Sequence, residues 1–165
     1  MLFLKDELMG YPILYLYEYN EFFKTLLYRY KGQYDYSLKD VFLSCYLGKL
    51  KRMYKDYVIA VTPSSMLQNN KRSFKPMEEI AKTLDLPLFT GLYKTTDYKQ
   101  SDQPYSKRKN IHQIIAIKDF EKLNHQKVLI IDDVMTSGQT LMACANCVKQ
   151  ANVKSISFLV LSKRV

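Results

Sequence analysis

The chain of 165 residues has the length of one ordinary domain, and an apolar fraction of 47% is ample for a single core. Charged residues at 25% and aromatic residues at 13% exclude a disordered chain, and no apolar run reaches the roughly 18 to 20 residues that span a bilayer. Acidic side chains occur among the first residues, too early for the apolar region of a signal peptide. Three cysteines cannot all pair within one chain. We therefore expect a cytoplasmic, single-domain protein over residues 1–165, without membrane insertion.

The formal net charge of +9 predicts a positive surface potential. Such a surface favours nucleic acid, nucleotides or phosphorylated metabolites as partners. A basic soluble protein without such a partner would have the same charge balance, so charge alone leaves both interpretations open.

The first half of the chain predicts alternating strands and helices. A β-rich segment over 13–19 predicts a strand, and Asn20 is placed to cap a helix that Gly32 ends. The apolar residues of that helix recur at helical spacing: Phe22, Phe23, Leu26, Leu27 and Tyr30. We expect a second helix over 38–54, a strand over 57–63 and a helix over 76–85 with Pro76 at its first position.

The second half continues the alternation. Residues 86–94 predict one strand or two short ones, and further strands are expected over 111–117, 126–133 and 155–162. The polar segment 95–110 predicts a lid or binding loop. A helix over 137–152 would turn four residues toward the core: Leu141, Cys144, Ala145 and Val148. Strands alternating with helices predict an α/β domain with a mostly parallel central sheet flanked by helices.

The segment VLIIDDVMTSGQT places two aspartates at the end of an apolar strand. Ligands collect at the carboxyl ends of parallel strands, and the following helix N-terminus attracts phosphate. Gly138 permits close approach of the backbone, and nearby hydroxyls add donors. Carboxylates repel phosphate, so we assign Asp132 and Asp133 to sugar hydroxyls or to a divalent cation. The pattern predicts a ribose 5-phosphate site. The alternative, in which Asp132 caps a turn and Asp133 faces solvent, fits the residues singly but not as an ordered unit.

This segment resembles the phosphoribosyl-pyrophosphate (PRPP) motif of type I phosphoribosyltransferases, with its apolar strand, acidic pair, Thr-Ser-Gly and following Thr. The resemblance implies the type I phosphoribosyltransferase fold with a small N-terminal hood region. It also implies that both aspartates meet the ribose hydroxyls and hold Mg²⁺, the expected cofactor, directly or indirectly. The PRPP-binding residues would be Asp132, Asp133, Val134, Met135, Thr136, Ser137, Gly138, Gln139 and Thr140.

One position narrows the branch of the fold. Hypoxanthine-guanine phosphoribosyltransferases carry a third aspartate where this chain has Thr136. Because a threonine hydroxyl cannot act as a general base near neutral pH, we do not expect purine salvage of that kind.

Three further segments resemble the ComF late-competence family, and the resemblance covers roughly residues 13–163. The matching residues are Lys31, Gly32 and Asp35, then Arg72 and Phe74, then Gln100, Arg108 and Asn110, with Lys107 as an alternative to Arg108. Ser73 and Lys75-Pro76 depart from the family's Gly and Asn-Gln. Many members begin with paired Cys-x-x-Cys motifs that look zinc-binding, and this chain has none before Cys45.

The resemblance also implies roles around the leaving group. The loop after residue 61 would bind pyrophosphate through Thr62, Pro63, Ser64, Ser65 and Arg72. Arg108 joins Asp132 and Asp133 as a catalytic residue, because a cationic lid with Lys107 and Lys109 could close over PRPP. An ordinary exposed loop is the alternative. Cys144 and Cys147 lie within the predicted helix, where core packing is expected over metal or redox use.

Two functions remain open. The first is transfer of a phosphoribosyl group from PRPP·Mg²⁺ to an unidentified acceptor with release of pyrophosphate. The second is a PRPP-sensing or single-stranded-DNA-binding role in DNA uptake and natural transformation, beside a helicase-like translocase of the ComFA type. Both can hold together, since a fold does not dictate an activity. The sequence leaves catalysis and a homodimer as open questions.

Overall fold

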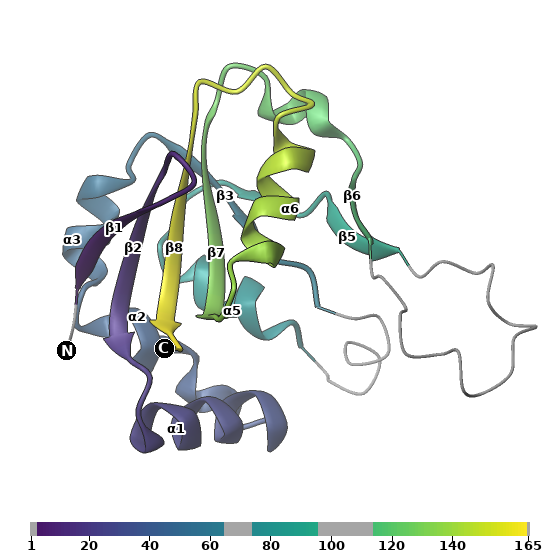
Figure 1. Ribbon diagram of the computed structural model, residues 1–165. Coiled ribbons are helices and arrows are strands. Elements are labelled where there is room, and N and C mark those ends of the chain that lie inside the picture. The colour runs from purple at the N-terminus through teal and green to yellow at the C-terminus, as the bar shows by residue number, and fades with distance from the viewer. Residues whose placement is uncertain (1–2, 65–73, 96–113, 165) are drawn as a thin grey trace, which may run out of the picture.

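The computed structural model describes residues 3–64, 74–95 and 114–164, and they form a six-stranded sheet in the order β1-β2-β8-β7-β3-β4 (Figure 1). Five strands run parallel: β2 (Tyr11–Glu18), β8 (Ser155–Lys163), β7 (Lys127–Met135), β3 (Tyr57–Val61) and β4 (Leu88–Phe89). Only the edge strand β1 (Leu4–Leu8) is antiparallel within this sheet. The predicted α/β class with a mostly parallel sheet is therefore confirmed.

The sheet separates two hydrophobic cores, because alternate residues of a strand face opposite sides. In β7, Val128 and Ile130 belong to one core and Leu129 and Ile131 to the other. Helix α6 (Gln139–Val148), in front of the sheet in Figure 1, covers the first core together with the separate hairpin of β5 (Leu92–Thr95) and β6 (Ile114–Ile117). Short helices cover the second core: α1 (Glu21–Gly32), α2 (Val41–Ser44), α3 (Leu47–Met53) and α5 (Pro76–Lys82).

Helix α1 follows its sequence signals closely. The Asn20 side chain accepts a hydrogen bond from the Phe23 amide at 2.9 Å, and the helix ends at Gly32. Phe23 and Tyr30 are buried, as expected. Phe22 is not part of that face: its side chain is 75% exposed, because the helix packs along a narrower stripe than the apolar sequence suggests. In Figure 1 this helix lies beyond the carboxyl ends of β2 and β8.

The single helix expected over 38–54 is divided into the 3₁₀ turn η1 (Tyr36–Asp40), α2 and α3. The break falls before α3, where Tyr46 has φ −118° and ψ 0°. This bend lets the Tyr46 ring pack against Phe3 and Tyr17, with centroids 5.0 and 5.7 Å away. Ring packing therefore overrides helix propensity at this point.

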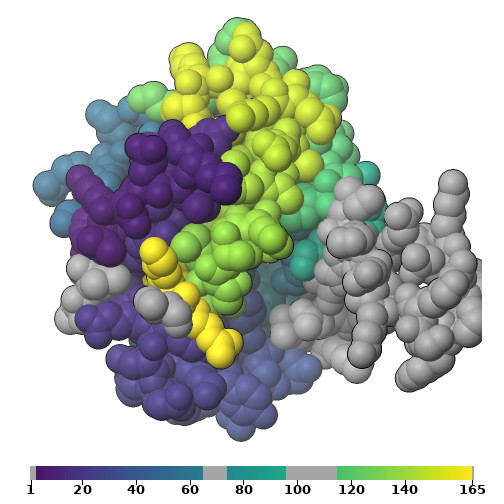
Figure 2. All heavy atoms as spheres, in the orientation of Figure 1, coloured from purple at the N-terminus to yellow at the C-terminus, as the bar shows by residue number. Residues whose placement is uncertain are grey.

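Strand β1 is absent from the sequence expectations. It pairs with β2 through a two-residue turn, Met9-Gly10, in which both residues have positive φ (47° and 86°). In the space-filling view of Figure 2 this hairpin lies against α6, and Leu8 contributes to the core beneath. A further 3₁₀ turn, η4 (Phe120–Leu123), connects β6 to β7. No helix within the described ranges is long and apolar enough to cross a membrane.

Candidate ribose phosphate site

Asp132 and Asp133 lie inside strand β7, not at its end. The sequence predicted a strand that stops at Asp133, whereas β7 continues to Met135 because β8 still pairs with it there, Met135 opposite Lys163. On the other side of β7, strand β3 stops at Val61. The last backbone hydrogen bond between the two segments runs from the Thr62 amide to the Ile131 carbonyl at 3.0 Å. The aspartates thus stand where the sheet loses a neighbouring strand, and Asp132 lines a small cavity there.

Asp132 is held by two donors. The Thr62 hydroxyl donates to its Oδ1 at 2.7 Å, and the Asp133 amide donates to the same oxygen at 2.9 Å. Burial and the neighbouring charge of Asp133 raise the pKa of Asp132 to about 7, despite the Thr62 hydrogen bond that favours the ionised form. Near neutral pH, small changes in the surroundings of this carboxyl group therefore change its protonation state.

Asp133 forms an ion pair with Lys31 of α1, with Nζ and Oδ2 2.5 Å apart. Burial alone would raise the pKa of Asp133, but the charge and hydrogen bond of Lys31 outweigh it, so the pKa lies below its ordinary value. The Asp133 side chain is 20% exposed, which does not fit the alternative of an aspartate facing solvent. One member of the acidic pair is thus ionised, while the other titrates near neutrality.

Sequence reasoning gave Lys31 a place in a family pattern but no role in the site. The contact joins residues that are 102 positions apart in the sequence, and no local sequence pattern predicts such a pairing. The available signal was indirect: a basic residue in the last turn of a helix, followed by glycine.

The loop from Thr136 to Thr140 follows β7 directly. Gly138 has φ +76°, a left-handed conformation that suits glycine, and α6 begins at Gln139. The side chains of Thr136, Ser137 and Thr140 are exposed, whereas Gly138 is buried. With Asp132 these residues line a small cavity of about 30 Å³. Exposed hydroxyls and free amides at a helix start can hold a phosphate group.

The two residues between the aspartates and this loop also line the small cavity, although their side chains belong to the cores. Val134 packs against one core, and Met135 is buried in the other, where the Tyr15 hydroxyl lies 3.5 Å from its sulfur. Val134 and Met135 have no side-chain hydrogen-bond donor, so their contribution to a phosphate site is limited to the backbone.

The described part of the pyrophosphate loop, Thr62, Pro63 and Ser64, lines a second cavity of about 200 Å³ at the carboxyl ends of β3 and β4. Thr62 joins this cavity to the aspartates through its hydrogen bond to Asp132. Ser65, Arg72 and Arg108 lie outside the described residues, as does the polar segment with Lys107 and Lys109.

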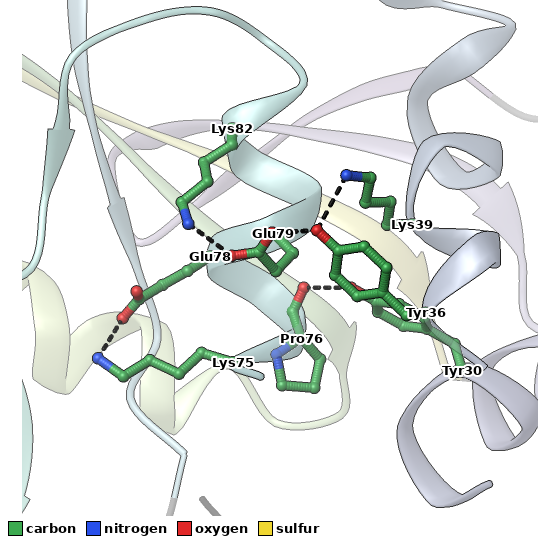
Figure 3. A network of polar contacts seen from close by, with 8 residues as sticks. All are labelled: Tyr30, Tyr36, Lys39, Lys75, Pro76, Glu78, Glu79 and Lys82. Carbon is green, nitrogen blue, oxygen red and sulfur yellow. Dashed lines mark hydrogen bonds and ion pairs between the residues drawn. The ribbon is translucent and has the colours of Figure 1, made fainter. Parts of the chain in front are cut away.

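A polar network fastens the hood, made of α1 and η1, to α5 (Figure 3). The Tyr30 hydroxyl donates to the Pro76 carbonyl at 2.8 Å, and the Tyr36 hydroxyl donates to Glu79 at 2.8 Å. Lys82 pairs with the same Glu79 carboxylate, and its hydrogen bond is the main cause of the lowered pKa of Glu79. Because Tyr30 precedes Lys31, these contacts hold α1 where Lys31 reaches Asp133.

The model of the phosphoribosyl transferase domain family matches residues 70–164. The chain belongs to this family. The type I phosphoribosyltransferase fold expected from the sequence is thereby confirmed, and the match spans β7, the loop 136–140, α6 and β8.

Two curated relatives support the ComFC-like resemblance. Competence protein ComFC of Bacillus subtilis (strain 168) is 27% identical over 154 residues, which cover 87% of this chain and 62% of the relative. Competence protein ComFC of Streptococcus pneumoniae (strain ATCC BAA-255 / R6) is 28% identical over 141 residues, covering 86% and 63%. The phosphoribosyltransferase-domain chain thus spans less than two thirds of the length of these relatives.

Among solved structures, a purine phosphoribosyltransferase from Pyrococcus horikoshii Ot3 aligns with a TM-score of 0.48 and 21% identity, over 76% of this chain and 73% of that chain. We rest the fold assignment on the family match and on the observed order of the strands.

The two cysteines of α6 pack in the core of this phosphoribosyltransferase domain. Cys144 and Cys147 are buried on α6, as expected for core packing, and the Cys147 thiol donates to the Ile115 carbonyl at 3.2 Å. Burial raises the pKa of both thiols. Across the described residues there is no cluster of three or more His, Cys, Asp or Glu side chains that could hold a metal ion by itself.

Proposed function

We propose that this chain binds PRPP at the edge of the sheet where β7 outlasts β3. The observation that carries the proposal is the acidic pair, with Asp133 paired to Lys31 and Asp132 bound by Thr62, beside an exposed hydroxyl loop at the start of α6. Membership of the phosphoribosyl transferase domain family supports it.

Each part of the ligand has a chemical counterpart. Asp133, kept ionised by Lys31, accepts hydrogen bonds from a ribose hydroxyl, and Asp132 accepts from the neighbouring one. Backbone amides and hydroxyls of Thr136, Ser137 and Thr140 hold the 5-phosphate. The loop of Thr62, Pro63 and Ser64 takes the pyrophosphate, together with Ser65, Arg72 and Arg108 as the family resemblance implies.

The donor set fits Mg²⁺ as a companion of the ligand. Two carboxylates, one of them paired with Lys31, are too few for a complete oxygen shell, but magnesium keeps several waters and binds through phosphates. When bound, the ion would neutralise charge on the pyrophosphate, while Asp132 and Asp133 contact it directly or through water.

We extend the proposal to phosphoribosyl transfer to a nitrogen nucleophile, either ammonia, an amine or a base. The bond between C1 and the pyrophosphate oxygen breaks, and its electron pair leaves with pyrophosphate. The nucleophile forms the new bond to C1 with its lone pair and then loses a proton. Ionised carboxylates near the ring stabilise the positive charge that develops on the sugar.

The decisive experiment is calorimetry with PRPP and Mg²⁺ on the wild type, on Asp133→Asn and on Asp56→Asn. Asp56 is an exposed aspartate just before β3, at the opposite end of the strands, so it matches the charge change without touching the site. We expect binding by the wild type and Asp56→Asn, and at least tenfold weaker binding by Asp133→Asn. A wild type that fails to bind PRPP would end the proposal. A pyrophosphate-release screen with ammonia, amines and bases then tests transfer.

A second function is favoured by the ComFC relatives and the net charge of +9. We propose that the chain acts in DNA uptake during natural transformation, in the cytoplasm, beside a helicase-like translocase of the ComFA type, and binds single-stranded DNA by its basic surface. Such binding should weaken steeply with salt, since contacts to phosphates release counterions. A fluorescence anisotropy titration at several salt concentrations measures it, and an absence of binding even at low salt would remove the DNA-binding part.

A further inference from the structure

The cavity of about 200 Å³ beside the pyrophosphate loop contains more positive charge than the loop itself supplies. Thr62, Pro63 and Ser64 form one wall and have no charged side chain. The charged residues that line the cavity come from other elements: Lys75 and Glu78 near the start of α5, Lys94 on β5, and Lys118 after β6. Three lysines face one carboxylate.

These lysines are not equivalent. Lys75 is neutralised locally, because its Nζ lies 2.9 Å from the Glu78 carboxylate (Figure 3). No ion pair within the described part of the chain involves Lys94 or Lys118. Asp119, next to Lys118 in sequence, pairs instead with Lys122 at 3.4 Å. Lys94 and Lys118 therefore supply the uncompensated charge of this cavity.

Lys94 is the better placed of the two. It stands two residues after buried Leu92 on β5, hence on the face of the hairpin that turns toward the core, and it is half-buried whereas Lys118 is exposed. Its charge also acts on the buried Cys144 thiol of α6, opposing the burial and the charge of Asp132 that raise the pKa of that thiol. Asp132 and Lys94 thus both lie within electrostatic range of the Cys144 side chain.

An anion is the natural occupant of such a cavity. A half-buried ammonium group without a carboxylate partner is costly, and a phosphate oxygen removes that cost through a charge-assisted hydrogen bond. The hydroxyls of Ser64 and Thr90 add neutral donors around the same space. The pyrophosphate loop forms a wall of this cavity, and a nucleophile must approach C1 from the side opposite the leaving group, so we place the leaving group and not the acceptor here.

We propose that Lys94, with Lys118 at the rim, binds the pyrophosphate end of the ligand in this cavity. The inference rests on the proposed function and extends it, because it assigns part of the leaving group's charge to Lys94 and Lys118, which no sequence motif included. Lys94 would recognise pyrophosphate, whether as part of PRPP or free, and would contribute nothing to the ribose 5-phosphate end.

The test separates the two ends of the ligand. Calorimetry is run with ribose 5-phosphate and, separately, with pyrophosphate and Mg²⁺, on the wild type, Lys94→Gln, Lys94→Arg and Lys154→Gln. Lys154 is an exposed lysine beside the first residue of β8, at the other end of the sheet, and controls for loss of one positive charge. We expect Lys94→Gln to weaken pyrophosphate binding about tenfold and to leave ribose 5-phosphate binding within about twofold of wild type. Lys94→Arg should restore most of the pyrophosphate affinity.

Each outcome has a distinct meaning. If the wild type binds ribose 5-phosphate, but Lys94→Gln and Lys154→Gln bind pyrophosphate equally well, the role of Lys94 is refuted while the proposed function stands. If Lys94→Gln weakens both ligands equally, the lysine acts on the structure of the site as a whole, and the assignment is again overturned. A wild type that binds neither ligand refutes the proposed function itself. Thermal unfolding of all four proteins shows whether each variant is folded.

Discussion

Lys31 crosses from the hood to the sheet and sets the charge state of Asp133, while Asp132, one residue earlier, has only neutral donors. Adjacent residues of a strand point to opposite sides, so neighbouring carboxyl groups can have different surroundings. The difference explains why the pKa of one is lowered and that of the other is raised to about 7. Two residue-scale predictions follow from this pair.

Asp132→Asn should stabilise the ligand-free protein at pH 8. The folded-state pKa of Asp132, about 7, exceeds its ordinary value of 3.8, so the folded protein binds more protons between these values and loses stability as the pH rises through them. Asparagine keeps the acceptor oxygen for Thr62 but does not ionise. The free energy of unfolding at pH 8 should therefore be about 1 to 4 kcal/mol higher for the variant than for the wild type. Urea unfolding at pH 4 and pH 8 measures it. The same difference between wild type and variant at both pH values would contradict the prediction.

Lys31→Met should destabilise the protein by about 1 to 2 kcal/mol at pH 7, because it leaves the ionised Asp133 partly buried without a partner. Lys24→Met is the matched control on the same helix, since Lys24 is 57% exposed and its pairing with Glu21 is a surface one. In an Asp133→Asn background the effect of Lys31→Met should largely disappear. Chemical unfolding of the wild type, the two single variants and the double variant measures this coupling. Additive effects of the two changes would show that the residues are not coupled.

At the scale of elements, the connection from β7 to α6 carries the phosphate loop, and Gly138 is its tightest point. A Cβ at this position would lie 3.0 Å from Cδ2 of Leu8, in the N-terminal hairpin, and φ is +76°. The N-terminal hairpin, which the sequence did not predict, therefore packs against the loop 136–140.

Gly138→Ala should cost about 1 kcal/mol of stability and weaken ribose 5-phosphate binding, since alanine is strained in the left-handed region. Gly48→Ala provides a control of opposite sign. Gly48 lies within α3 with no atom within 4 Å of an added Cβ, so alanine there should stabilise by about 0.5 to 1 kcal/mol. Thermal unfolding and calorimetry compare the two, and equal effects of both changes on binding would count against a specific role of Gly138.

The elements that could be predicted from sequence are those whose signals are local. Asn20 caps α1, Pro76 opens α5, and the apolar run of β7 leads into an amphipathic α6. Strand β1 was not predicted because its sequence, LKDEL, is mostly polar, as suits an edge strand with little burial. The division of 38–54 and the pairing of Lys31 with Asp133 depend on contacts between distant residues, which a single sequence does not display.

Across the molecule, the described residues of the candidate site gather at one edge of the central sheet. Asp132 and Asp133 come from β7, Thr62 from the end of β3 and Lys31 from α1, and the hood network keeps these pieces in register. A ligand that contacts all of them at once binds only the folded chain. Its binding should therefore appear as global stability and not only as local protection.

PRPP with Mg²⁺ at one hundred times its dissociation constant should raise the free energy of unfolding by about 2.7 kcal/mol. For a domain of this size the midpoint of thermal unfolding should rise by roughly 5 to 10 °C. Asp133→Asn, with at least tenfold weaker binding, should show about half of this rise or less at the same concentration. An unchanged midpoint for the wild type, at a concentration that saturates it in calorimetry, would contradict the prediction.

The burial of two of the three cysteines has a practical consequence. Cys144 and Cys147 are enclosed beneath α6, whereas Cys45 is exposed and lines an apolar groove with Phe22 and Phe42. A thiol-reactive fluorophore added to the folded wild-type protein will therefore attach at Cys45 alone. This position lies in the bend between α2 and α3 and shares the groove with Phe22 of α1. The label would therefore report movements of the hood without any engineered cysteine.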